Sequence, residues 1–253
     1  MRKWAELERL EGLTPNLLHN RASTLDALGR HDEALTTIDE AIAAEPQQGL
    51  NYYTRGMIRE HCGQPEHAID DYLRALECDQ DHFDAAINLV ELAPQAQAVP
   101  AVLARVAALL DAAPTASKLL FVLGRLKMEE GDLPGARQAL EESVRREPRL
   151  AISWYTLSML YPIIGDHEAA LCATDRALRD FPDDAGLWVG RGQALEELRR
   201  QSEAMACYDR AVALSPDDGT PWYHLGRLLL LDLERPAGAR GALKEALRLQ
   251  PEN

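Results

Sequence analysis

The sequence lacks any long apolar segment and is short of positive charge. No run among the 253 residues approaches the roughly 18 apolar residues that a membrane-spanning helix needs, which excludes a spanning protein. Lysine and arginine number 27 against 41 aspartates and glutamates, so the net charge is −14. A surface of that sign is poorly suited to neutralising phosphates, and we do not expect nucleic acid as a partner. The 46% of hydrophobic residues is typical of a folded chain.

Signals for secretion, metal binding and catalysis are also missing. Residues 1–9 carry charge throughout and contain no apolar core of a signal peptide, so we expect a cytoplasmic protein. The four cysteines form no CxxC pair and are interpreted as small buried residues. His61, Cys62 and His67 form the one cluster with ligand chemistry. They straddle a Gly-Gln-Pro turn instead of lying one helical turn apart, so no metal is predicted there.

No catalytic motif is found along the chain. A GxSxG elbow, a phosphate-cradling glycine loop and an HExxH helix are all absent. Acidic residues are plentiful, but a charged, solvated helix face explains most of them. We therefore predict that the protein is not an enzyme and has no cofactor.

A period of 34 residues runs through the sequence. It is marked by residues of three types at fixed spacing: Trp154, Trp188 and Trp222; Pro114, Pro148, Pro182 and Pro216; and Ala34, Ala68, Ala136, Ala170 and Ala204. Such a repeat is typical of solenoid proteins, in which each unit packs only against its neighbours. The register divides the chain into seven units: 15–48, 49–82, 83–116, 117–150, 151–184, 185–218 and 219–253. The last unit is one residue longer, and we place the extra residue near 232–235.

Each unit has the pattern of two helices joined by a turn. In the fifth unit, Trp154, Leu157 and Tyr161 recur at helical spacing before Gly165 breaks the chain, and Pro182 closes the unit. Glycines recur at the turn, where a left-handed conformation is easiest for glycine. Glycine and alanine at the helix contact points let two helices approach closely. A large residue that lies between the alanines on the second helix fills the groove of the neighbouring helix. The small positions on the first helices are Gly56, Gly124, Gly192 and Gly226.

These residues resemble the tetratricopeptide repeat family over essentially the whole chain. The pattern is clearest in the last three units, with Trp154-x2-Leu157, Trp188-x3-Gly192 and Trp222-x2-Leu225. Unit 83–116 departs most from it. The resemblance implies an all-α solenoid of about fifteen helices, in which antiparallel helix pairs wind into a right-handed superhelix with a concave groove. Residues 1–14 are interpreted as an N-terminal half-repeat that provides a capping helix.

The composition of the groove is the main functional signal. Positions on the first helices that should line it carry Tyr, Met, Phe and Arg, types that are enriched at interface cores. The candidate peptide-binding residues are Tyr53, Met57, Phe121, Arg125, Tyr155, Met159, Val189, Gln193, Tyr223 and Arg227. The alternative is that these side chains only pack one helix against the next. The acidic neighbours Glu129, Glu196 and Glu197 favour a partner with basic residues beside its apolar anchors.

We therefore expect a cytoplasmic, non-enzymatic scaffold or adaptor that binds a protein or peptide in its groove, without nucleic acid or membrane. Two alternatives stay open: a regulatory or substrate-presenting domain of a larger enzyme or signalling assembly, and a receptor for a small signalling peptide.

The first helix of the seventh unit is apolar nearly all round, because it contains most of the leucines between Leu228 and Leu233. This predicts self-association through an uncapped C-terminal repeat. Pro94 and Pro162, late in two first helices, should shorten or bend those helices.

Overall fold

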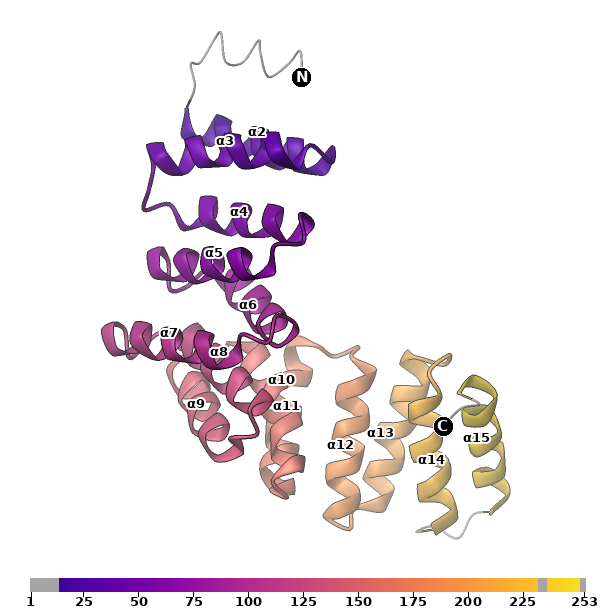
Figure 1. Cartoon of the computed structure of the whole chain (residues 1–253). Helices are drawn as coiled ribbons and strands as arrows, with labels where there is room; N and C mark the ends of the chain where they lie inside the picture. The colour runs from indigo at the N-terminus through magenta and orange to yellow at the C-terminus, as the bar shows by residue number, and fades with distance from the viewer. Residues whose placement is uncertain (1–13, 232–235, 251–253) are drawn as a thin grey trace. The chain divides into compact units, whose positions relative to one another are not determined.

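The protein is all-helical in the computed structural model, which describes residues 14–231 and 236–250. Fourteen helices and no strand are found within these residues (Figure 1). They follow one another as seven pairs: α2 (Pro15–Ala27) with α3 (His31–Ala44), α4 (Gly49–His61) with α5 (Pro65–Cys78), α6 (Phe83–Gln95) with α7 (Val99–Ala112), α8 (Ser117–Glu129) with α9 (Leu133–Arg146), α10 (Ala151–Ile163) with α11 (His167–Asp180), α12 (Ala185–Glu197) with α13 (Gln201–Leu214), and α14 (Gly219–Leu231) with α15 (Pro236–Leu249).

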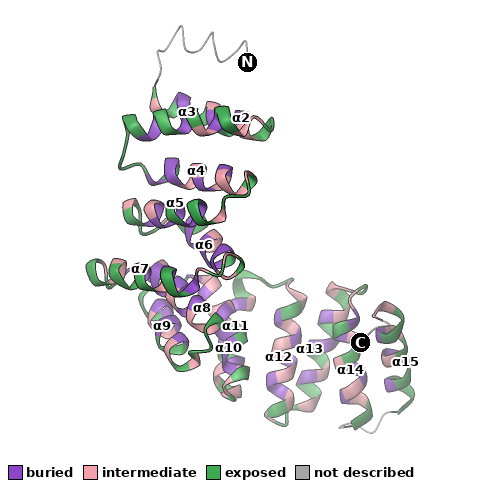
Figure 2. Cartoon of the chain, in the orientation of Figure 1, coloured by how far each residue is buried: buried purple, intermediate pink, exposed green. Residues whose placement is uncertain are grey.

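The chain divides into two compact units, residues 1–146 and 147–253. The first contains α2 to α9 and the second α10 to α15. In both units buried residues are spread along the helix pairs instead of gathering in one centre (Figure 2). The predicted capping helix before residue 14 and the extra residue near 232–235 lie outside the described residues.

Local sequence signals set the ends of the helices. The Asp184 side chain accepts a hydrogen bond from the Leu187 amide at 2.8 Å, which satisfies one of the free donors at the start of α12. Each predicted turn glycine has a positive φ of 68° to 79°, the left-handed conformation expected of a helix C-cap: Gly29, Gly63, Gly131 and Gly165. Gln97 and Arg199 occupy the same place in two other repeats, with φ of 54° and 60°. A residue with a Cβ is strained in that conformation.

Close helix approach within a repeat accounts for the glycines on the first helices. A Cβ added to Gly56 would lie 2.6 Å from Cε1 of Tyr72, and one added to Gly226 would lie 2.7 Å from Cγ of Leu243. Tyr72 is fully buried in this contact. The predicted pairing of a small residue on one helix with a large one on the next is confirmed.

A hydrogen bond explains why the tryptophans and prolines share one period. The indole Nε1–H of Trp154 donates to the carbonyl oxygen of Pro148 at 3.1 Å, six residues earlier. Trp188 donates to Pro182 and Trp222 to Pro216 in the same way, at 2.8 and 3.1 Å. Each bond ties the first helix of a repeat to the loop that precedes it.

Two predictions about helices are wrong in part: the shortening of α6 and α10, and the exposure of Leu228. Pro94 and Pro162 do not shorten α6 and α10, which are 13 residues long like the first helices of the other repeats. Each proline lies one residue before the end of its helix. Leu228 is completely buried, because α15 packs on α14. Leu230 and Leu231 are exposed, and Leu233 lies outside the described residues.

Candidate functional site

The first helices of the second unit form a pocket of about 410 Å³. It is lined by residues of α10, α12 and α14 and by the first residue of α11: Pro162, His167, Gln193, Ala194, Glu196, Glu197, Tyr223, His224 and Arg227. We refer to it as the α12–α14 pocket. Three of the ten residues predicted for the groove, Gln193, Tyr223 and Arg227, meet there. The 34-residue register brings them together because they occupy related places on successive first helices.

A buried carboxylate organises the floor of this pocket. The Glu196 side chain is only 9% exposed, and it accepts a hydrogen bond from the Tyr208 hydroxyl. Arg227 Nη2 lies 2.8 Å from the same carboxylate oxygen. Burial, followed by the bond to Glu196, raises the pKa of Tyr208, which therefore stays protonated. Glu196 is consequently a structural group whose charge Arg227 already offsets.

His224 is the titratable group of the pocket wall. Its ring stacks on Tyr208 at 5.5 Å between centroids, and its Nε2 lies 3.2 Å from Nε2 of Gln193. Burial and the neighbouring Arg227 lower the pKa of His224, so the ring is neutral at pH 7. His224 Nδ1 and Arg227 Nε are buried without a hydrogen-bond partner in the described part of the chain. Because both nitrogens are buried, a ligand in the pocket could bond to them only if the side chains shifted.

An apolar stripe runs along α10 beside the pocket. Tyr155, Met159 and Ile163 follow one another at four-residue spacing, so they lie on one side of the helix. Met159 is 48% exposed and Ile163 62%, while Tyr155 is half-buried and meets the Phe181 ring edge-on at 6.1 Å. Burial, with a smaller contribution from Asp184, raises the pKa of Tyr155. Among the predicted residues of the second unit, Met159 and Tyr223 are the exposed apolar ones, Tyr223 at 51%, and Ile163, which is not among the candidate residues, adds a third exposed side chain.

The remaining predicted residues have other surroundings. Phe121 is 2% exposed and Val189 is also buried, so both pack between helices in this structure. Arg125 pairs with Glu129 at 2.8 Å. Tyr53 is half-buried and contacts the Tyr72 and His82 rings, and Met57 is half-buried. Sequence reasoning missed His167 and His224, whose position in the pocket depends on how neighbouring repeats stack.

The first unit carries a related but acidic pocket, four repeats earlier in the register. It measures about 120 Å³ and is lined by Glu60, Asn88, Glu91, Leu92 and Gln95. Glu60 accepts the Tyr72 hydroxyl as Glu196 accepts that of Tyr208. Glu91 stands where the second unit has Arg227, so the same position adds a negative charge here and a positive one there.

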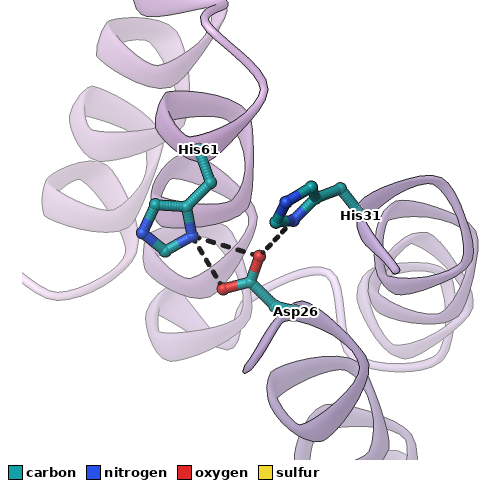
Figure 3. A group of neighbouring side chains, drawn as sticks. All are labelled: Asp26, His31 and His61. Carbon is teal, nitrogen blue, oxygen red and sulfur yellow. Dashed lines mark hydrogen bonds and ion pairs between the residues drawn. The ribbon is translucent and has the colours of Figure 1, made fainter. Parts of the chain in front are cut away.

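The sequence predicts no metal at His61, Cys62 and His67, and these three residues are not the group that the structure brings together as possible metal ligands. Within residues 14–231 and 236–250, the structure brings His61 together with Asp26 and His31 instead (Figure 3). This arrangement joins two repeats and could not be inferred from spacing along one repeat.

Comparison with known families identifies the chain. The sequence profile of the tetratricopeptide repeat matches residues 19–85, 121–175 and 164–219, which together exceed half of the chain. The chain belongs to the tetratricopeptide repeat family. Such repeats are generally scaffolds for protein interaction, and the helix-pair solenoid described above is their fold. No curated protein sequence matches the chain.

Solved structures of low sequence identity share this fold. PilW, a widely conserved type IV pilus biogenesis factor, is 16% identical with a TM-score of 0.61, and the match covers 85% of this chain and 98% of PilW. A tetratricopeptide repeat protein from Parabacteroides merdae is 18% identical with a TM-score of 0.55, covering 93% of each chain. YrrB, described as having an unusual peptide-binding site, is 16% identical with a TM-score of 0.54, covering 85% of this chain and 93% of YrrB. No helix among the described residues is long and apolar enough to cross a bilayer.

Proposed function

We propose that the protein is a non-enzymatic adaptor whose second unit binds a peptide segment of a partner protein along α10, α12 and α14. The observation that carries the proposal is the exposure of Met159, Ile163 and Tyr223 beside a pocket that is lined largely by polar and charged side chains. Large apolar side chains that remain exposed next to a concavity are typical anchors for a partner.

The charges of this surface favour a specific kind of ligand. Glu196 is neutralised by Arg227, so Glu197 is the carboxylate of the pocket that remains exposed. A peptide with two or three apolar anchors and one basic residue beside them fits that surface. We retain a cytoplasmic location as part of the proposal, which cell fractionation tests.

Affinity capture from source cells, followed by mass spectrometry, tests the proposal. Tyr155→Ala combined with Met159→Ala should weaken capture several hundredfold, which would abolish it in practice, since truncating each of the two anchors costs about 2 kcal/mol. Met205→Ala is the matched control, because it makes the same truncation on α13, a second helix outside the pocket. Far-UV circular dichroism should show unchanged helicity.

Two outcomes contradict this assignment. Capture by the double variant at wild-type strength places the binding surface elsewhere on the chain. A double variant that melts much earlier yet still captures its partners shows that Tyr155 and Met159 serve packing. In the expected case, raising the salt concentration weakens capture only moderately, because a single exposed carboxylate contributes.

We also propose that the protein self-associates through the helix pair α14 and α15. A pocket of about 490 Å³ lies between α14 and α15 and is lined mostly by apolar groups, with Tyr223, Leu243, Ala246 and Leu247 among them. Leu247, which lines this pocket, is exposed, and so are Leu230 and Leu231 at the other end of α14. Two copies that stack these faces would cover them, so light scattering should report a dimer that Leu247→Gln dissociates. A wild-type monomer at high concentration contradicts this proposal.

A further inference from the structure

Three helices of the first unit direct one ligand-type side chain each to a common point (Figure 3). Asp26 is the penultimate residue of α2, His31 opens α3, and His61 ends α4. The left-handed turn at Gly29 folds α3 back on α2, and stacking of the second repeat on the first adds His61. One donor atom from each of the three residues lies within 4.8 Å of the other two.

The distances between these atoms match a metal coordination sphere. His31 Nδ1 lies 2.8 Å from Asp26 Oδ1, and His61 Nδ1 lies 2.9 Å from Asp26 Oδ2. Ligands of a tetrahedral zinc ion, at bond lengths of about 2.0–2.1 Å, are separated by about 3.3 Å. Both distances are about 0.4–0.5 Å shorter than this spacing, and the three ligand atoms lie within 4.8 Å of one another, so the side chains would have to move slightly away from Asp26 to admit the ion.

The electrostatic surroundings favour a cation. The C-terminal ends of α2 and α4, which carry partial negative charge, meet here with the N-terminal end of α3, which carries partial positive charge, so two of the three helix ends favour a cation. Arg30, the nearest cation along the chain, is held by Glu33 at 2.6 Å.

We propose that Asp26, His31 and His61 form a zinc site that clamps the first two repeats together. Two imidazole nitrogens and one carboxylate oxygen suit zinc or a similar transition metal, and they do not suit magnesium or calcium, which prefer oxygen ligands. The fourth position is open to solvent, because His61 is 57% exposed in its side chain. The site is separate from the α12–α14 pocket and does not depend on peptide binding.

Isothermal titration of the metal-free chain with zinc chloride tests the site. We expect one zinc ion per chain, no heat of binding with magnesium chloride, and at least a tenfold loss of zinc affinity in Asp26→Asn and in His61→Asn. His67→Asn is the matched control: it removes an exposed histidine of α5 that belongs to the cluster suggested by sequence alone, and it should bind zinc as the wild type does.

A second measurement guards against damage to the fold. Zinc should slow hydrogen exchange at the α2–α3 turn and at the end of α4 in the wild type, and leave exchange in α10 to α15 unchanged. His31→Asn, at the start of a helix and partly exposed, should abolish that local effect with unchanged circular dichroism. Zinc affinity that is equal in wild type, Asp26→Asn and His61→Asn, or no saturable binding by the wild type, overturns the proposal.

Discussion

Two glycines in α12 should respond to the same substitution with opposite effects on stability. Gly190 has no atom within 4 Å of where an added Cβ would lie. At Gly192, two residues later, an added Cβ would lie 2.8 Å from Cζ and 2.9 Å from Cδ1 of Tyr208, and closer still to Cε1. Tyr208 is fully buried and its hydroxyl is bound to Glu196, so the ring has no room to retreat.

The expected change in the free energy of unfolding is the sum of a gain in helix propensity and a cost of overpacking. Replacing glycine by alanine inside a helix gains about 0.5–1 kcal/mol at either position, because alanine loses less backbone entropy. Overpacking costs about 1–3 kcal/mol and applies to Gly192→Ala alone. Gly190→Ala should therefore raise the free energy of unfolding by up to about 1 kcal/mol, and Gly192→Ala should be about 1–3 kcal/mol less stable than Gly190→Ala.

Urea unfolding followed by circular dichroism measures both variants against the wild type. Because the propensity gain is common to both, the difference between the two variants isolates the contact with Tyr208. Equal stability of the two variants would refute the close approach of α12 and α13, and with it the pairing of small and large residues throughout the solenoid.

Three further predictions concern stability. Arg199→Gly and Gln97→Gly should each raise the free energy of unfolding by about 1 kcal/mol, since both residues have a positive φ that strains a Cβ; no gain in the urea midpoint would contradict the turn geometry. Ala204 is fully buried, so Ala204→Leu should cost about 1–3 kcal/mol, and an unchanged melting temperature would show that the repeat register is wrong. His224 has a lowered pKa, so the unfolded chain takes up its proton first as pH falls below about 6.5 and stability declines until the folded-state pKa is passed. His224→Phe should lose this part of the pH dependence in melting curves between pH 7.5 and 5, while Met205→Ala should keep it.

The sequence by itself determined the repeat, the helix pairs and their contact points. Tryptophan, proline, alanine and glycine recur with the period of one repeat, and each acts on its own helix or on the adjacent turn, as Gly165 does with its positive φ. Even the Trp154 to Pro148 bond spans only six residues. Such signals are local and repeated, so they can be read without knowing how the repeats stack.

Only the tertiary structure decided which side chains remain accessible and which charges remain free. Phe121 and Tyr223 looked alike as groove residues, yet the first is buried and the second is half exposed. Arg227 was a candidate for contacting a peptide, but its guanidinium already pairs with Glu196, 31 residues away. Asp26 and His61 meet across 35 residues because two repeats stack there. Contacts of this range depend on which residues a neighbouring repeat presents, and that differs from one junction to the next although the period stays the same.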